Sequence, residues 1–271
     1  MKKQQLIVTT DFLKTKGFTN PTVGIVLGTG LGNLVNEVDI EVEISYSDIP
    51  NFPISTVVSH AGKLIYGTLS GKKVVLMSGR FHAYEDYSLW EVTYGIRVMK
   101  ELGIETLLIS NAAGAINLNY KKGDLMLLED HINLQGNSPL VFKKASEFGN
   151  IFADMSEPYS KKLNSQIKNI AIQNNIDLKE GVYAGVLGPQ LETRAEYRML
   201  QILEVDTVGM STVPEVIVAK SINLPCVAIS VLTDECDPLN LHQVDIKDII
   251  AIAEKAEPKL ILLFKELIKQ L

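Results

Sequence analysis

Residues 23–32, Val-Gly-Ile-Val-Leu-Gly-Thr-Gly-Leu-Gly, constrain the fold more strongly than any other segment of the sequence. The first half is a short apolar run rich in β-branched residues, which predicts a buried β-strand. In the second half, three glycines within five positions let the backbone turn sharply with its N–H groups uncovered, and Thr29 adds a hydroxyl group. Such a strand and turn are typical of an anion-binding loop, although a purely structural glycine turn fits the pattern equally well.

Two common phosphate-binding motifs do not match this loop. The dinucleotide fingerprint needs a glycine at the position of Asn33, and the ATP-binding loop needs a Gly-Lys-Ser/Thr sequence after Gly32. Neither is present in the sequence. The loop therefore indicates an anion site only if other residues of the chain supply positive charge and further hydrogen-bond donors.

The composition is that of an ordinary globular protein and argues against several classes of partner. With 26 basic and 32 acidic residues among 271, the chain has a net charge of −6 and no basic block, so we expect neither nucleic acid nor an anionic membrane as a partner. Cys226 and Cys236 are the only cysteines, which favours a reduced, cytoplasmic protein. The apolar residues 6–8 are too few for a signal peptide, and no apolar run approaches the roughly 18 residues of a spanning helix.

Strand-like and helix-like patterns alternate along the whole chain, without repeats or a linker. The pattern predicts strands at residues 23–27, 42–45, 64–69, 74–77, 106–110, 182–187, 206–209 and 226–232. It predicts helices at residues 89–102, 160–174, 193–203, from 214 onward and at 244–269. Hairpins mixed with βαβ units imply a mixed central sheet with helices on both faces, in a single α/β domain over residues 1–271. The long loop at residues 135–158 is expected to be functional.

Polar residues gather where the predicted strands end. Arg80 and His82 follow one strand, and their spacing of two places both side chains on one side of an extended chain. His60 lies on a glycine-containing loop, Ser211 precedes a predicted helix, and small residues at 111–114 follow another strand. Ligands of open α/β sheets bind outside the carboxyl ends of the strands, so these residues predict a shared anion site. Each residue taken alone also fits a structural role.

Six motifs occur together along the chain. They are Gly28-Thr29-Gly30-Leu31-Gly32, Ser59-His60-Ala61-Gly62, Gly79-Arg80-Phe81-His82-Ala83-Tyr84-Glu85, Ser110-Asn111-Ala112-Ala113-Gly114, Gly188-Pro189-Gln190-Leu191-Glu192-Thr193 and Val208-Gly209-Met210-Ser211-Thr212-Val213-Pro214-Glu215. With these motifs the chain resembles the trimeric purine nucleoside phosphorylase family, from its N-terminal strand to its C-terminal helix. The resemblance implies a partly barrel-like sheet, no metal or organic cofactor, and a homotrimer.

The family reaction is phosphorolysis, in which inorganic phosphate, itself a substrate, attacks the anomeric carbon of ribose and the purine base departs. By position, the resemblance assigns phosphate binding to Thr29, His60, Arg80, His82, Ser211 and the N–H group of Ala112. It assigns nucleoside binding to Tyr84, Phe148, Tyr183, Leu191, Glu192, Met210, Thr233, Asp234 and His242. The implied catalytic residues are His82, which Glu85 would support, Glu192, which would accept from the ring N–H of a 6-oxopurine, and Asp234. Phe148 would reach the ribose site of a neighbouring subunit.

Three positions depart from the family pattern. Thr29 stands where many members have serine, and Leu191 replaces an aromatic residue that packs on the base. Asp234 follows Thr233 where the 6-oxopurine enzymes commonly have asparagine. An asparagine amide both donates and accepts, whereas an ionised aspartate only accepts, which suits a 6-amino group; a protonated aspartate could donate to N7.

The substrate prediction therefore keeps alternatives. Aspartate at this place is also a feature of the related methylthioadenosine phosphorylases, and Ile246 stands where the 6-oxopurine enzymes have a histidine for the ribose 5′-hydroxyl, with His242 four residues earlier. The motifs at residues 81–85 and 209–211 follow the nucleoside enzymes instead. We predict phosphorolysis of inosine and guanosine. Phosphorolysis of methylthioadenosine or adenosine is the alternative, and nucleoside or dinucleotide binding without turnover is a third.

Overall fold

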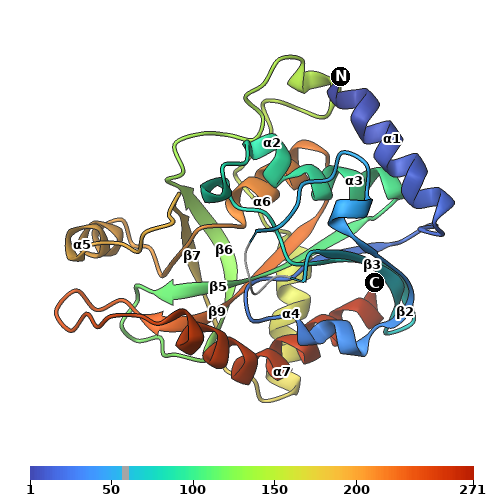
Figure 1. The fold of residues 1–271 in the computed structure, drawn as a ribbon. Helices are drawn as coiled ribbons and strands as arrows, with labels where there is room; N and C mark the ends of the chain where they lie inside the picture. The colour runs from blue at the N-terminus through green and yellow to red at the C-terminus, as the bar shows by residue number, and fades with distance from the viewer. Residues whose placement is uncertain (57–60) are drawn as a thin grey trace.

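The computed structural model describes residues 1–56 and 61–271 (Figure 1). In this part of the chain one sheet has the strand order β2-β3-β4-β1-β5-β8-β7-β6-β9, and β5 also pairs with β9. The strands are β1 (Val23–Val26), β2 (Asp39–Ser45), β3 (Lys63–Leu69), β4 (Lys72–Ser78), β5 (Thr106–Ala115), β6 (Leu125–Asn133), β7 (Leu178–Gly185), β8 (Thr207–Gly209) and β9 (Cys226–Glu235). Because β5 pairs with both β8 and β9, the last five strands in the order close into a barrel. The predicted mixed, partly barrel-like sheet is confirmed.

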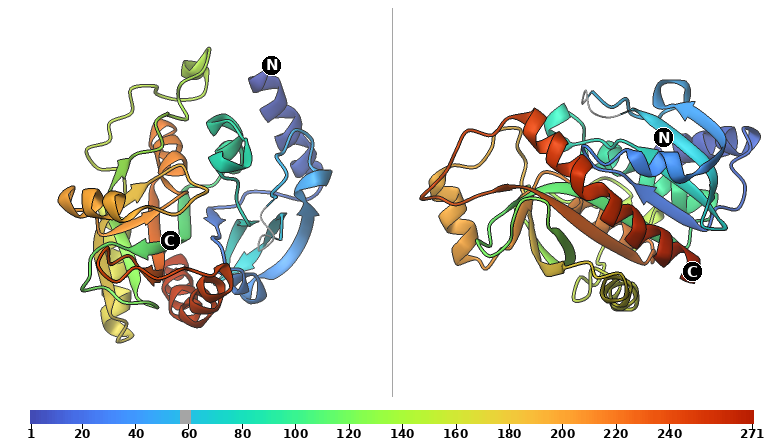
Figure 2. Two further views of the ribbon diagram at one scale, coloured as in Figure 1. Left: turned by 60° about the vertical axis from the view of Figure 1, so that its left-hand side comes forward. Right: turned by 90° about the horizontal axis from the view of Figure 1, so that it is seen from below.

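Helices cover both faces of this sheet (Figures 1 and 2). In the described residues they are α1 (Lys2–Thr15), α2 (Leu89–Val92), α3 (Tyr94–Leu102), α4 (Lys161–Gln173), α5 (Arg194–Ile202), α6 (Val213–Ser221) and α7 (Ile246–Gln270). Apolar residues of α1, α3 and α6 share one buried cluster, and those of α4 and α7 belong to a second. The predicted α/β class with helices on both faces is therefore confirmed, and α5 projects from the barrel end of the molecule.

Strand β1 lies in the middle of the sheet and sets the position of the glycine-rich loop. It runs parallel to β4 on one side and β5 on the other, with Val26 beside Met77 and Ile109. All four residues of β1 are buried, as expected for a strand covered on both faces. β1 and β4 therefore end together beside the middle of β5, where the segments after Val26 and Ser78 meet Ser110.

Some elements follow the sequence pattern closely and others do not. Gly103 ends α3 with φ of 115°, as predicted, but the helix expected over residues 89–102 is broken at Thr93 into α2 and α3. Helix α1 was not predicted, because two of its four buried residues are Thr9 and Thr10, which weaken the apolar periodicity. Strand β6 was also missed, because its second half is polar and partly exposed.

The close packing of β1 against β5 makes a specific prediction about two glycines of the loop. A Cβ atom at Gly28 would lie 2.7 Å from the Cα atom of Asn111, whereas one at Gly32 would meet nothing within 4 Å. We expect Gly28→Ala to lower the free energy of unfolding by about 1–3 kcal/mol, because the β5 backbone must move. The matched Gly32→Ala should change it by less than about 0.5 kcal/mol. Equal denaturant midpoints for the two variants would contradict this packing.

Candidate active site

A cavity of about 290 Å³ opens where β1 and β4 end beside β5 and continues along the second half of β5. Its walls come from many separate segments of the chain. They are Thr29, Arg80, His82, Tyr84, Ala112, Ala113, Gly114, Pro189, Leu191, Glu192, Val208, Gly209, Met210, Ser211, Thr233, Asp234, Ile246 and Ile249. The structure therefore brings most of the predicted site residues together around one space.

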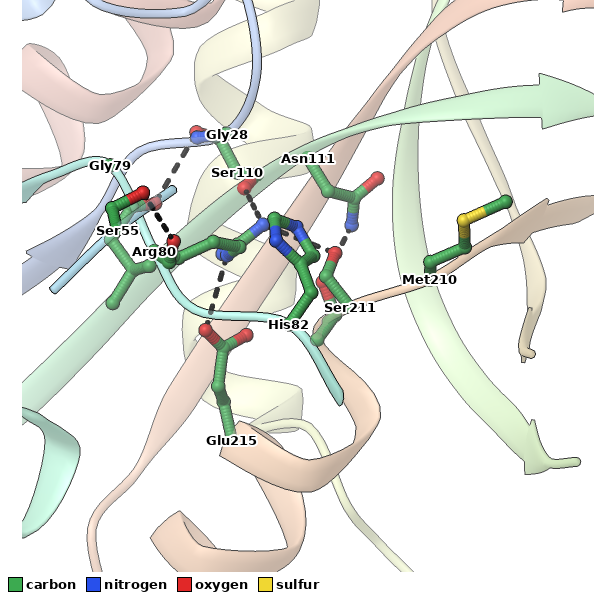
Figure 3. A network of polar contacts seen from close by, with 12 residues as sticks. Gly28, Ser55, Gly79, Arg80, His82, Ser110, Asn111, Met210, Ser211 and Glu215 are labelled. Carbon is green, nitrogen blue, oxygen red and sulfur yellow. Dashed lines mark hydrogen bonds and ion pairs between the residues drawn. The ribbon is translucent and has the colours of Figure 1, made fainter. Parts of the chain in front are cut away.

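Arg80 is the buried cation of this cavity (Figure 3). Its side chain is only 2% exposed, and its Nε–H donates to Glu215 Oε1 over 3.1 Å. Its Nη1 donates to the Ser110 carbonyl oxygen at 2.8 Å and to Ser211 Oγ at 3.2 Å. These contacts, made to β5 and to the segment before α6, hold the guanidinium plane in one orientation. A guanidinium held in this way presents its donors in a geometry that matches phosphate or carboxylate oxygens.

Ser211 is positioned by a strained turn. The next residue, Thr212, has φ of 67° and ψ of −54°, and the Val213 N–H donates to the Ser211 carbonyl at 2.7 Å. This is a γ-turn of the rare, strained form, which is costly for a β-branched residue. The buried Thr212 hydroxyl accepts a hydrogen bond from Asn111 Nδ2 at 2.9 Å, which helps to hold the turn. The strain therefore serves to aim the Ser211 hydroxyl at Arg80.

Tyr183 supports the same segment from behind. Its hydroxyl accepts a hydrogen bond from the Ser211 N–H at 3.3 Å, and its side chain is fully buried. Burial raises the pKa of Tyr183 to about 12, so the hydroxyl stays protonated. A Cβ atom at Gly209 would lie 2.4 Å from this hydroxyl, so the position requires glycine. Tyr183, predicted as a nucleoside-binding residue, thus lies behind the cavity wall and contacts Ser211.

His82 is held by Glu85, as the resemblance implied. The Glu85 carboxylate accepts from the His82 backbone N–H at 2.8 Å and contacts Nδ1 at 2.9 Å, while Thr56 donates to its other oxygen. Burial acts to raise the pKa of Glu85, but the hydrogen bonds from His82 and Thr56 outweigh it and lower the pKa to about 2. The imidazole also stacks on Tyr84, with ring centroids 4.6 Å apart. Both side chains are therefore fixed at the cavity wall.

Two carboxyl groups, Glu192 and Asp234, line the barrel end of the cavity. Burial raises the pKa of Glu192, a hydrogen bond from Tyr197 lowers it in part, and the charge of Asp234 adds to the rise. Asp234 Oδ1 accepts from the Thr233 hydroxyl at 3.2 Å. Asp234 pairs with Gly114 on β5. Gly114 follows Ser110 by four residues, and the Ser110 carbonyl oxygen accepts a hydrogen bond from Arg80. At about 3.3 Å per residue, the carboxyl end and the Arg80 end are roughly 13 Å apart.

The remaining predicted residues lie elsewhere. Phe148 packs against Trp90, with ring centroids 4.9 Å apart, and lines a separate cavity of about 380 Å³. His242 is exposed in the segment before α7. Ile246, which stands at the position of the family's histidine for the ribose 5′-hydroxyl, lines the active-site cavity. His60 lies outside the described residues, and its predicted role stays a prediction.

Sequence reasoning missed two residues with clear contacts in this geometry, Glu215 and Cys236. Glu215 lay within a recognised motif, but nothing in the sequence indicated that it would pair with Arg80, 135 positions away. Cys236 is buried beside Asp234, and its Sγ–H donates to Oδ2 of that carboxylate at 3.2 Å, a contact that the sequence did not indicate.

The described residues, 1–56 and 61–271, offer neither a metal site nor a membrane-spanning helix. No group of three or more His, Cys, Asp or Glu side chains among them is placed to hold a metal ion. None of their helices has the length and apolar character needed to cross a membrane.

The protein has an α/β fold with one cavity that holds a buried arginine at one end and two carboxyl groups at the other. The chain belongs to the phosphorylase superfamily, whose family model matches residues 22–269. This match covers the whole sheet and nearly all of α7.

Within this superfamily, the chain is similar to proteins named purine nucleoside phosphorylase. The chain is 44% identical over 261 residues to purine nucleoside phosphorylase 1 of Geobacillus stearothermophilus, covering 96% of this chain and 95% of that protein. It is 46% identical over 222 residues to the purine nucleoside phosphorylase of Bos taurus, covering 79% of this chain and 76% of that protein.

Solved structures agree with this comparison. Isoform 2 of purine nucleoside phosphorylase from Schistosoma mansoni, in complex with cytosine and ribose-1-phosphate, has a TM-score of 0.94 at 40% identity, covering 99% of this chain and 96% of that chain. A Schistosoma mansoni purine nucleoside phosphorylase in complex with inosine has a TM-score of 0.93 at 37% identity, covering 99% and 96%.

Proposed function

We propose that this protein catalyses the reversible phosphorolysis of purine ribonucleosides and 2′-deoxyribonucleosides, with inosine and guanosine as its preferred substrates. The products are the free purine base and ribose 1-phosphate or deoxyribose 1-phosphate, which places the enzyme in purine salvage. The observation that carries the proposal is the pairing, within one cavity, of Arg80 with Glu192 and Asp234. Ser110, which binds Arg80, and Gly114, which pairs with Asp234, are roughly 13 Å apart along β5, a spacing that suits a purine nucleoside with a phosphate below its sugar.

At the Arg80 end we place inorganic phosphate. The guanidinium supplies the positive charge, Ser211 and Thr29 supply hydroxyl groups, and the glycine-rich loop and β5 supply backbone N–H groups, including that of Ala112. His82 and the predicted His60 complete the set. Held there, a phosphate oxygen attacks the anomeric carbon of the sugar while the bond to the base breaks, so positioning is a large part of catalysis. The proposal needs no metal or organic cofactor, since phosphate is the nucleophile.

At the other end we place the base, on which negative charge develops as it leaves. Glu192 accepts a hydrogen bond from the N1–H of a 6-oxopurine, which fixes the orientation of the ring. Asp234 and Thr233 face the five-membered ring and the 6-substituent, where they interact with that charge. Leu191 and Met210 contribute apolar contact, and Tyr84 lies beside the sugar.

The homotrimer is also part of this proposal. Phe148 lies away from the cavity of its own chain, on a long loop that exposes Val141 and Phe152, 73% and 85% exposed. Such apolar side chains on a loop favour a contact with another subunit. We therefore place Phe148 against the ribose site of a neighbour, which makes oligomerisation necessary for a complete site. Both cysteines are unpaired, which supports a cytoplasmic location.

One alternative has observations of its own. Asp234 suits a 6-amino group better than asparagine would, and Ile246 and Ile249 make the cavity wall apolar near the start of α7. An apolar wall favours a methylthio group over a hydroxyl at the ribose 5′ position. Adenosine or 5′-methylthioadenosine is therefore the second candidate substrate.

The substrate assignment is tested by measuring kcat/KM for inosine, guanosine, adenosine and methylthioadenosine, each with and without saturating phosphate. We expect base release to require phosphate and to be fastest with the two 6-oxopurine nucleosides. A preference of tenfold or more for methylthioadenosine, about 1.4 kcal/mol in barrier, would replace the 6-oxopurine assignment with the alternative. Absence of phosphate-dependent release from every nucleoside would leave a binding protein without turnover.

The role of Arg80 is tested with two substitutions and a surface control. Arg80→Lys keeps a cation beside the buried Glu215 but loses the planar fork, so we expect the KM for phosphate to rise about tenfold. Arg80→Ala removes the charge and should raise it further, roughly 10- to 100-fold, as the loss of a charged hydrogen-bond partner costs about 1.5–3 kcal/mol. Arg198→Ala, on the exposed side of α5, is the matched control. An unchanged phosphate KM in both Arg80 variants would remove Arg80 from the phosphate site.

A further inference from the structure

The glycine-rich loop is held at both of its ends by contacts to other segments of the chain. At its start, the Gly28 N–H donates to Ser110 Oγ at 3.3 Å, and Gly28 packs directly on the β5 backbone. At its other end, Asn33 begins a short 3₁₀ helix, Asn33–Glu37. The Asn33 backbone N–H donates to Oε1 of Glu257 at 2.7 Å, and Asn33 Nδ2 donates to Oε2, also at 2.7 Å. Glu257 on α7 therefore binds the end of the loop with both carboxylate oxygens.

Glu257 is a charged residue on the buried face of α7. It is 1% exposed, and the same helix face buries Ala256 and Leu260. A carboxylate in this place loses its hydration, so burial raises the pKa of Glu257, whereas the hydrogen bonds from Asn33 act to lower it. An apolar side chain at this position would avoid the cost of burying a charge. The carboxylate is therefore explained by the loop end that it binds and not by the packing of the helix.

The same helix also contacts the middle of the loop and the cavity. A Cβ atom at Gly30, where φ is 70°, would lie 2.8 Å from the Cβ atom of Ala253 and 3.3 Å from the Cα atom of Ile250. The backbone of the loop therefore lies directly on α7. Nearer the start of the helix, Ile246 and Ile249 line the active-site cavity. Helix α7 thus extends from the cavity wall to the end of the loop.

These contacts leave Thr29 between two fixed points of the backbone. Thr29 lines the cavity, and only residues 29–32 separate Gly28 from Asn33. Helix α7 is anchored by apolar residues of the second buried cluster, among them Leu263 and Phe264, so the helix is the support and the loop is the part that it positions. A loop already held in its binding geometry loses less conformational entropy when a ligand binds, and the affinity for that ligand rises.

We propose that Asn33 and Glu257 are positioning residues that hold the glycine-rich loop in the geometry needed to bind phosphate. Loss of their hydrogen bonds frees the loop at Asn33 while β1 and α7 stay in place. Phosphate binding is then weakened, and nucleoside binding is nearly unchanged. The inference rests on the proposed phosphorolysis and adds to it two residues that lie outside the cavity wall.

The test uses three variants of the pair and one control. Asn33→Ala removes the Nδ2 donor from an exposed residue, so the fold is retained. Asn33→Asp places a second carboxylate opposite Glu257, and the like charges repel. Glu257→Gln removes the charge but keeps two groups that pair with Asn33, because the two side-chain amides can each donate and accept. Glu254→Gln, on the exposed side of the same helix, is the matched control.

The dissociation constant for inorganic phosphate is measured by calorimetry, and the KM for phosphate and for inosine by initial rates, below the unfolding temperature of every variant. We expect the phosphate constant and the phosphate KM to rise about threefold in Asn33→Ala, which loses one hydrogen bond to a charged group, and about tenfold or more in Asn33→Asp. Both should stay within about twofold of wild type in Glu257→Gln and Glu254→Gln, and so should the KM for inosine in all four variants.

A structural role without positioning would lower the unfolding temperature but would not act on one substrate alone. Unchanged phosphate binding in Asn33→Asp, or an equal rise in the KM for inosine and for phosphate, would therefore overturn the inference. A rise in Glu257→Gln as large as that in Asn33→Asp would overturn it as well, because the charge and not the hydrogen bonds would then matter. Failure of the wild type to release base from any nucleoside with phosphate would instead overturn the proposed function.

Discussion

The buried pair of Arg80 and Glu215 is the interaction on which the site depends. Both side chains are almost fully excluded from water, so each ion loses hydration that the other must replace. The pair joins the end of β4 to the first turn of α6, and the second arm of Arg80 reaches β5. Three segments far apart in the sequence are thereby held around one cation. A buried ion pair that contributes little net stability can still hold a positive charge at the position where phosphate is proposed to bind.

The surrounding backbone holds that buried charge beside the cavity. Gly28 lies so close to β5 that no side chain fits, and Thr212 adopts a strained turn that directs Ser211 toward Arg80. Such strain persists only where neighbouring contacts hold it, and here Asn111 supplies one of them. The glycine loop therefore acts as one wall of a site whose charge comes from Arg80.

The sequence predicted the parts of the site that depend on strand ends. Arg80, His82 and Ser211 were found because polar residues after buried strands meet at one edge of a parallel sheet. Glu215 was not, because its pairing with Arg80, 135 positions away, forms only in the folded chain, and no local pattern encodes that. The same applies to α1, whose inward face includes threonines that hydrogen-bond to other segments, such as Thr9 to Tyr94. The proposed place of Phe148 in a neighbouring subunit stays a prediction, and within its own chain Phe148 packs against Trp90.

The central claim is that phosphate bound beside Arg80 is the nucleophile. The most direct test is ³¹P NMR of the wild-type protein with inosine and inorganic phosphate, with hypoxanthine measured in the same sample. The account predicts that the phosphate signal declines and that a ribose 1-phosphate signal grows in an amount equal to the hypoxanthine released. Release of hypoxanthine with an unchanged phosphate signal would mean that water attacks the sugar, and would contradict it.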